Sequence, residues 1–238
     1  MSLCMKTVEE VLRRSSFILF LVFAGIFFCG NCTRSRRETN PSPEENPASY
    51  PLFRDQDDRP VIAAFGDSLT AGSGVDPAEN YPSRLQAKLD AEGYRYRVVN
   101  AGVSGETSSQ GLSRAKSVQA LNPAIVIIEF GGNDGLRGVP VETTRRNLAA
   151  MVSLFRSKGA KVILAGMEIP PNYGPQYTRE FHNIFAGVAE EHGAALIPFF
   201  LEDVGGHRGL NQDDGIHTTS EGYAIVVENV WKVLKPLL

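Results

Sequence analysis

The apolar positions of this chain fall into short, near-continuous runs separated by polar segments with a helical period. The runs occupy residues 61–65, 96–100, 124–130, 161–165 and 194–197. Uninterrupted apolar runs of this length are typical of strands buried on both faces of a sheet. The segments between them carry apolar residues three and four apart and end at Gly93, Gly159 and Gly193. They are therefore predicted to be helices with a glycine at the C-cap.

The alternation of strands and helices predicts one α/β domain over residues 60–238, closed by a helix over residues 221–234. Parallel strands need crossover helices that cover both faces of the sheet, so we expect a three-layer α/β/α sandwich with a five-stranded parallel sheet. Ligands bind such sheets beyond the carboxyl ends of the strands. Polar turns with glycine follow the first three strands, so Ser68, Gly105 and Asn133 are expected to converge at that edge.

The first 59 residues show a different pattern. Basic residues precede an apolar run at residues 17–28, which is long enough for the core of an export signal and short for a spanning helix. Residues 1–32 are therefore predicted to be a signal peptide or an N-terminal anchor. Residues 33–59 are rich in proline and charge, as expected of a disordered polar linker. The protein is expected to be exported to the periplasm or cell envelope.

Membrane attachment is left open by this N-terminal pattern. Cys29 and Cys32 follow the apolar run, but the residues before them match a lipoprotein cleavage site poorly, because Phe28 or Asn31 stands where a small residue is usual. Cleavage of a signal, lipidation at Cys32 or Cys29, and an uncleaved anchor all remain compatible with the sequence. A membrane tether is thus one of three alternatives.

Charge and cysteine content exclude several functions for the domain. The net charge of the 238 residues is −3, and the first 59 residues carry eight basic and eight acidic side chains, so the negative charge lies in the domain. This balance argues against a nucleic-acid partner. The cysteines are Cys4, Cys29 and Cys32, so the domain has no disulfide, thiol nucleophile or thiolate metal site. Its chemistry must use oxygen and imidazole, and no cofactor is expected.

Ser68 is a candidate nucleophile. It follows the first strand in the segment Gly66-Asp67-Ser68-Leu69, where glycine lets the backbone turn sharply beneath a serine whose side chain remains accessible. Asp-Ser after a strand is equally typical of a helix N-cap. This segment alone does not decide between the two interpretations, because short motifs often occur by chance.

A base for Ser68 is offered near the C-terminus by Asp214 and His217. A carboxylate three residues before an imidazole can accept a hydrogen bond from one ring nitrogen while the other nitrogen faces the serine. A metal site made of Asp213, Asp214 and His217 is the competing interpretation. It lacks a second cluster of ligands at a recognisable spacing, so no metal is expected.

Four sequence blocks together resemble the SGNH (GDSL) hydrolase family, and within it the bacterial thioesterase I/lysophospholipase and arylesterase branch. The blocks occur in order at residues 66–69, 100–107, 131–134 and 214–217. The resemblance implies a flavodoxin-like SGNH hydrolase fold and a serine-dependent ester hydrolase. It further implies that Ser68 is the nucleophile, His217 the base and Asp214 its orienting carboxylate. The oxyanion hole would comprise the backbone N–H groups of Ser68 and Gly105 and the side-chain amide of Asn133.

The substrate is less closely defined than the chemistry. Five apolar or aromatic residues near the blocks either line an acyl groove or pack beneath loops: Leu69, Leu136, Ile169, Tyr173 and Ile216. If these residues line a groove, the expected substrate is a small-molecule or lipid ester with an acyl chain, such as an arylester, an acyl-CoA thioester or a lysophospholipid. A carbohydrate O-acetylesterase is the alternative enzyme. A surface-tethered binding protein on an inactive hydrolase fold is the alternative from another class, although the complete set of reactive groups favours turnover.

Overall fold

The structure is a computed structural model that describes residues 57–238. The predicted signal or anchor, both candidate lipidation cysteines and nearly all of the predicted linker lie outside the described residues. The linker's last residues are described: Arg59 donates to the Asp57 carboxylate at 2.7 Å and to the Tyr96 carbonyl at 3.3 Å. The chain is therefore already bonded to the domain at residue 59.

Five parallel strands form the central sheet, in the order β2-β1-β3-β4-β5. They are β1 (Val61–Gly66), β2 (Arg97–Gly102), β3 (Ile125–Glu129), β4 (Lys161–Ala165) and β5 (Ala195–Ile197). The predicted five-stranded parallel sheet is confirmed. The chain passes from β2 on one side of β1 to β3 on the other side, so the winding direction reverses between β1 and β3. In open α/β sheets this reversal opens a crevice at the carboxyl edge.

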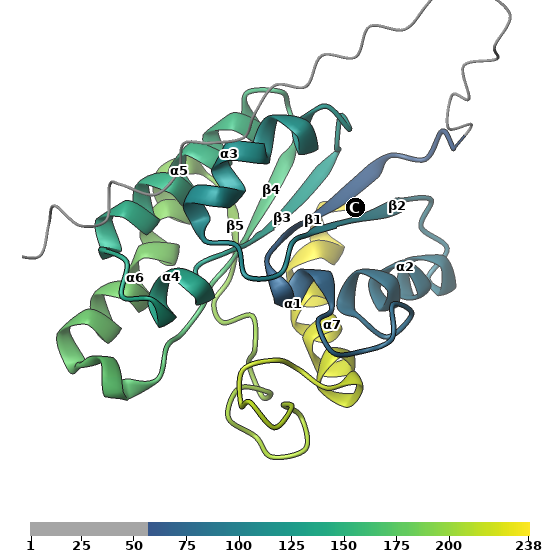
Figure 1. The fold of residues 1–238 in the computed structure, drawn as a ribbon. Coiled ribbons are helices and arrows are strands. Elements are labelled where there is room, and N and C mark those ends of the chain that lie inside the picture. Colours follow the sequence, from purple (N-terminus) through teal and green to yellow (C-terminus); the bar gives the residue numbers. More distant parts are fainter. Residues whose placement is uncertain (1–56) are drawn as a thin grey trace, which may run out of the picture. The chain divides into compact units, whose positions relative to one another are not determined.

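Helices cover both faces of the sheet, which confirms the three-layer sandwich (Figure 1). On one face α3 (Ser108–Gln119), α5 (Val141–Arg156) and α6 (Pro175–His192) lie side by side. On the other face α2 (Tyr81–Ala91) packs beside α7 (Ser220–Leu234). Two short helices, α1 (Ser68–Ala71) and α4 (Gly132–Leu136), follow β1 and β3 at the carboxyl edge. Short 3-10 turns occupy Pro171–Tyr173 and Lys235–Leu237.

The structure departs from the predicted element bounds where local pattern carried little signal. The second strand was expected over residues 96–100, but β2 continues to Gly102 because its ladder with β1 extends to the Gly66–Gly102 pair. The segment after β3 was expected to be a turn and instead forms α4. Five residues are too few to show a helical period, and two of the first four are glycine, so no local signal marked α4.

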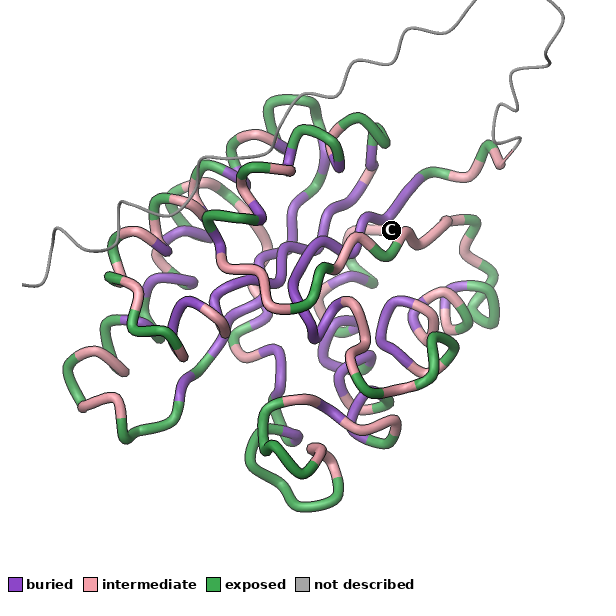
Figure 2. Tube along the Cα trace, viewed as in Figure 1, coloured by how far each residue is buried: buried purple, intermediate pink, exposed green. Residues whose placement is uncertain are grey.

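Burial explains why the strand segments are almost wholly apolar. β1 and β3 are buried along their full length, whereas the edge strand β2 is only partly buried. The buried centre and the exposed loops are distinguished in Figure 2. Phe65 packs edge-on against Phe130 and Phe155, with ring centroids 4.9 Å and 5.7 Å apart, between the sheet and its helices. Across residues 57–238, no helix combines the length and apolarity that crossing a bilayer requires.

Candidate active site

Ser68 is the first residue of α1, directly beyond the carboxyl end of β1. The preceding Asp67 caps this helix, because its Oδ1 accepts a hydrogen bond from the Leu69 N–H at 3.1 Å. The two interpretations of this segment are therefore compatible: Asp67 is the N-cap, and Ser68 stands on the strand-to-helix turn. Ser68 is only 7% exposed. The turn thus presents one hydroxyl at a confined position on the carboxyl edge of the sheet.

The turn is supported from below by Glu129, the last residue of β3. Its side chain is fully buried, and Oε2 accepts from the Thr70 hydroxyl at 2.8 Å and from the Asp67 N–H at 3.3 Å. Burial raises the pKa of the Glu129 carboxyl well above its usual value, so the neutral acid is the favoured form. Gly66 is required here because a Cβ would collide with Thr70 Oγ1 and with Glu129. The nucleophile turn is therefore held closely against β3.

Asn133 lies on α4 and is brought to the same turn, as the sequence predicted for this edge. Its Nδ2 donates to Asp67 Oδ2 at 3.0 Å. Asp67 is only 2% exposed, and burial raises its pKa to about 6, while the hydrogen bonds from Leu69 and Asn133 oppose that rise. Asp67 thus joins the helix cap to the amide of Asn133.

A third buried carboxyl group, that of Asp134, anchors α4 to the N-terminus of α3. It accepts from the Ser108 N–H at 2.7 Å and from the Ser108 hydroxyl at 2.5 Å, and Thr144 on α5 donates to it at 3.2 Å. An anionic group at a helix N-terminus is stabilised by the free N–H groups there. The position of Asn133 is consequently fixed by the helix layer as well as by Asp67.

Gly105 lies on the turn between β2 and α3 with φ of +80°, a left-handed conformation that glycine adopts without strain. The neighbouring Glu106 accepts from Arg114 Nε at 2.7 Å. Arg114 also donates to the carbonyls of Ala101 at 2.9 Å and Gly66 at 3.1 Å. One guanidinium therefore joins the Gly105 turn to the ends of β1 and β2.

Asp214 and His217 form a close pair on the loop before α7. His217 Nδ1 lies 2.6 Å from Asp214 Oδ2, and Asp214 Oδ1 accepts the backbone N–H groups of Ile216 at 2.8 Å and His217 at 2.9 Å. These hydrogen bonds, led by the one with the His217 side chain, lower the pKa of Asp214 to about 2. Asp214 is therefore ionised near neutral pH and can accept a hydrogen bond from a protonated Nδ1 of His217. The remaining ring nitrogen, Nε2, is then the basic one.

The loop with His217 is bonded to the segment with Ser68. Gln212 Nε2 donates to the Ser73 carbonyl at 2.8 Å, and the Gln212 N–H donates to the His217 carbonyl at 2.7 Å. From α7, Tyr223 donates to the Leu69 carbonyl at 2.9 Å. Residues more than 130 positions apart in the sequence are thus held at one site.

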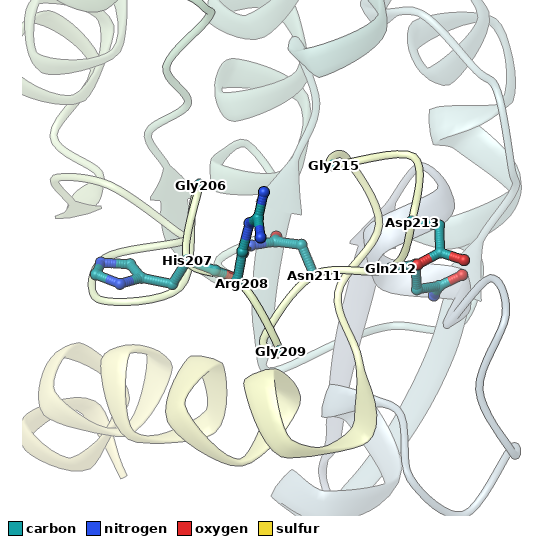
Figure 3. Close-up of a pocket in the computed structure, with 8 residues that line it drawn as sticks. All are labelled: Gly206, His207, Arg208, Gly209, Asn211, Gln212, Asp213 and Gly215. Carbon is teal, nitrogen blue, oxygen red and sulfur yellow. Dashed lines mark hydrogen bonds between the residues drawn. The ribbon is translucent and has the colours of Figure 1, made fainter.

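The loop that contains Gln212 also forms an open hollow of about 490 Å³, which is lined by glycines and polar residues (Figure 3). Arg208 extends between the two arms of the loop, whereas His207 and Asp213 point outward on opposite sides. The lining contains no large apolar side chain: Gly206, His207, Arg208, Gly209, Asn211, Gln212, Asp213 and Gly215. This hollow is therefore a poor site for an acyl chain.

The five residues predicted for an acyl groove divide into two groups. Leu69 and Ile169 are 5% and 6% exposed and belong to the hydrophobic core. Leu136 and Tyr173 are partly exposed, and the Tyr173 hydroxyl donates to the Leu136 carbonyl at 2.9 Å. Ile216, next to His217, is 44% exposed. Leu136, Tyr173 and Ile216 are therefore the members of the set that present surface to a ligand.

Three residues of the site were not identified from the sequence: Glu129, Arg114 and Arg137. Glu129 had a usable signal, because a carboxylate at the end of an otherwise apolar strand needs partners when buried. Both arginines donate to backbone carbonyls of distant segments, Arg114 to those of Ala101 and Gly66 and Arg137 to that of Gly105, and no local pattern reveals such contacts. Within residues 57–238, no three metal-binding side chains are grouped closely enough to hold an ion.

The sequence of this chain is similar to those of a known family and of several of its members. Residues 64–225 match the GDSL-like Lipase/Acylhydrolase family. Esterase TesA of Pseudomonas aeruginosa is 48% identical over 179 residues, which cover 75% of this chain and 89% of that protein. Thioesterase 1/protease 1/lysophospholipase L1 of Escherichia coli K12 is 35% identical over 179 residues, covering 75% and 85%.

Solved structures show the same arrangement of elements. The crystal structure of TesA superposes with a TM-score of 0.73 at 47% identity, covering 75% of this chain and 99% of that one. Esterase EstA from Pseudoalteromonas sp., inhibited by monoethylphosphonate, superposes with a TM-score of 0.71 at 35% identity, covering 74% and 97%.

Proposed function

Because the chain belongs to the GDSL-like lipase/acylhydrolase family, we propose that it is a serine ester hydrolase with Ser68 as nucleophile and His217 as base. One observation carries this assignment. The 2.6 Å Asp214–His217 pair lies on a loop that is hydrogen-bonded to the segment after Ser68, which supports an assignment of base and nucleophile to one site. Nothing in a simple helix cap requires a distant imidazole with a carboxylate partner.

The first step is acylation of Ser68. His217 Nε2 takes the hydroxyl proton as Oγ attacks the ester carbonyl carbon, and the carbonyl oxygen becomes an oxyanion. The Ser68 N–H at the start of α1, the Gly105 N–H and the Asn133 amide would donate to that oxyanion. The imidazolium then protonates the leaving alcohol or thiol, and the acyl-enzyme remains.

Deacylation repeats the same steps with water. His217 removes a proton from water as the water oxygen attacks the acyl carbon, and the proton returns to Ser68 Oγ when the acid leaves. Asp214 keeps the proton of the imidazole on Nδ1 throughout and stabilises the positive charge that forms on the ring. The low pKa of Asp214, about 2, keeps this carboxylate ionised during the cycle.

The substrates are proposed to be esters or thioesters of acyl chains, including arylesters, acyl-CoA and lysophospholipids. The names of the relatives include esterase, thioesterase and lysophospholipase. In this chain the exposed or partly exposed apolar surface of Leu136, Tyr173 and Ile216 supports an apolar acyl group. Export to the cell envelope is part of the proposal and rests on the apolar run at residues 17–28.

Replacement of Ser68 by alanine tests the assignment. We expect Ser68→Ala to abolish hydrolysis of a short p-nitrophenyl ester, because the nucleophile of the acyl-enzyme is lost. A fluorophosphonate probe should label the native wild-type chain and should fail to label Ser68→Ala or the heat-denatured protein. The matched control is Ser157→Ala, an exposed serine whose hydroxyl donates only to the Leu154 carbonyl. Undiminished turnover in a folded Ser68→Ala variant would disprove the proposal.

A further inference from the structure

The two oxyanion donors contributed by loops come from separate segments of the chain. Gly105 lies on the turn after β2, and Asn133 lies on the five-residue helix α4 after β3. Gly105 and Asn133 are both partly exposed, although α4 is anchored to α3 through Asp134. Stabilisation of an oxyanion depends on donors that are held in place before the reaction. The Gly105 N–H and the Asn133 amide therefore need a contact that fixes their positions relative to each other.

Arg137, the C-cap residue of α4, contacts both donors. Its Nη2 donates to the Gly105 carbonyl at 2.9 Å and lies 3.4 Å from Asn133 Oδ1. The first is a hydrogen bond of ordinary length, and the second is a longer, weaker contact. The Arg137 side chain is exposed, so these contacts do not hold the hydrophobic core together.

The Asn133 amide is thereby fixed at both ends. Its Nδ2 donates to Asp67 at 3.0 Å, and its Oδ1 faces the Arg137 guanidinium. The reversed amide would place an oxygen against the Asp67 carboxyl and an NH₂ group against a guanidinium that can only donate. The charges of Asp67 and Arg137 therefore select one orientation of the amide. In that orientation the second N–H of Nδ2 is free to face a substrate oxygen.

From these contacts we infer that Arg137 is a positioning residue, which locks the Gly105 turn and the Asn133 amide together as one oxyanion hole. This inference rests on the proposed function and extends it to a residue outside the nucleophile, base and donors. The role is to lower the barrier to turnover, since the oxyanion exists in the transition state and not in the bound ester.

The test uses the full-length chain and a neutral p-nitrophenyl ester. We expect Arg137→Met to lower kcat about tenfold and to leave KM within about twofold, because an interaction realised in the transition state is weakened. Arg137→Lys should recover part of the loss, since one donor to the Gly105 carbonyl can be retained. The rate of fluorophosphonate labelling should fall by a similar factor, because the phosphonyl oxygen occupies the same donors.

A double-mutant cycle distinguishes positioning from an independent effect. In an Asn133→Ala background, Arg137→Met should cost clearly less than in the wild type, because one of the two groups it positions is already absent. Equal losses in both backgrounds would contradict the inference. A rise in KM confined to anionic acyl-CoA, with kcat unchanged, would also contradict it and would make Arg137 a binding site for substrate charge.

The matched control is Arg146→Met on the exposed side of α5, where the guanidinium contacts only the Glu142 carbonyl of its own helix, at 3.3 Å. Turnover and thermal midpoint should both match the wild type. If Arg137→Met behaves like this control while Ser68→Ala is inactive, the inference fails and the proposed function stands. If Ser68→Ala retains turnover, the proposed function itself fails.

Discussion

Two aspartates beside the candidate nucleophile have opposite environments. Asp67 is 2% exposed, and burial raises its pKa to about 6. The Asp214 side chain is 45% exposed, and hydrogen bonds from His217 lower its pKa to about 2. The same type of side chain therefore serves a different purpose at each of the two positions. Asp67 is a structural residue that caps a helix and holds an amide, whereas Asp214 remains charged beside an imidazole that must accept a proton.

The comparison shows why proximity to the serine in the sequence is a poor guide in predicting which carboxylate is catalytic. Asp67 is adjacent to Ser68 in the sequence, but its oxygens are occupied by Leu69 and Asn133. Asp214 is 146 positions away from Ser68, and one of its oxygens lies 2.6 Å from His217. The hydrogen-bond partners, and not the spacing along the chain, assign the two roles.

The largest expected effect is the loss of activity when Asp214 is replaced. Asp214→Asn should lower kcat on the order of 10³- to 10⁴-fold, because an amide can hold the imidazole in the wrong tautomer and does not stabilise its positive charge. Steady-state hydrolysis of a p-nitrophenyl ester measures the loss. Asp213→Asn is the matched control: this neighbouring carboxylate is exposed, and the replacement should leave kcat within about twofold. Near-normal turnover in Asp214→Asn would remove the orienting role of Asp214.

The next effect concerns the buried carboxyl beneath Asp67. Glu129→Ala should lower the free energy of unfolding by about 3 kcal/mol, because a cavity forms and the Thr70 hydroxyl and Asp67 N–H lose their acceptor. Glu129→Gln should cost less, about 1 to 2 kcal/mol, because the amide keeps an acceptor oxygen but its NH₂ group takes the place of the buried Oε1, which has no hydrogen-bond partner. Urea denaturation at pH 7 measures both changes. Equal destabilisation by glutamine and alanine would show that the structure depends on an ionised Glu129.

The smallest effect is a difference in how stability depends on pH. Asp67 binds its proton up to about pH 6 in the native state but only to about pH 4 when unfolded. Wild-type stability should therefore fall as pH rises from 4 to 6. Asp67→Asn lacks this titration, so its thermal midpoint relative to wild type should rise on the order of 3 °C between pH 4 and 7.

The control for this pH dependence is Asp214→Asn, because the pKa of Asp214 is lowered in the native state whereas that of Asp67 is raised. The native pKa of Asp214, about 2, lies below its unfolded value, so its stabilising contribution is present above about pH 4 and is lost as pH falls toward 2. The midpoint difference between Asp214→Asn and wild type should stay constant from pH 4 to 7 and change only below pH 4. A parallel shift in both variants would mean that Asp67 does not titrate as its burial requires.

Much of this molecule follows from its sequence because the relevant signals are local. The apolar runs predict the strands, since a strand buried on both faces is almost wholly apolar, as β1 and all of β3 except Glu129 are. The blocks containing Ser68, Gly105, Asn133 and His217 mark the residues that can react or donate. Convergence on one edge follows from parallel strands, whose carboxyl ends meet. The catalytic roles themselves stay predictions until the variants are measured.

Other features are absent from any local pattern because they depend on distant partners. Glu129 supports the nucleophile turn only because Thr70 and Asp67 donate hydrogen bonds to it, and Arg114 reaches the carbonyls of Gly66 and Ala101. The helix α4 forms because Asp134 is anchored on α3, although its own residues include two glycines.

The sequence by itself determined the α/β class, the strand segments and the reactive side chains, because periodicity and residue chemistry are properties of short stretches. The tertiary structure alone decided which aspartate is buried, which of the predicted groove residues reach the surface, and that Arg137 contacts both Gly105 and Asn133. Burial and hydrogen-bond partners arise only when segments far apart in the chain pack together, and they set the pKa and orientation of each group.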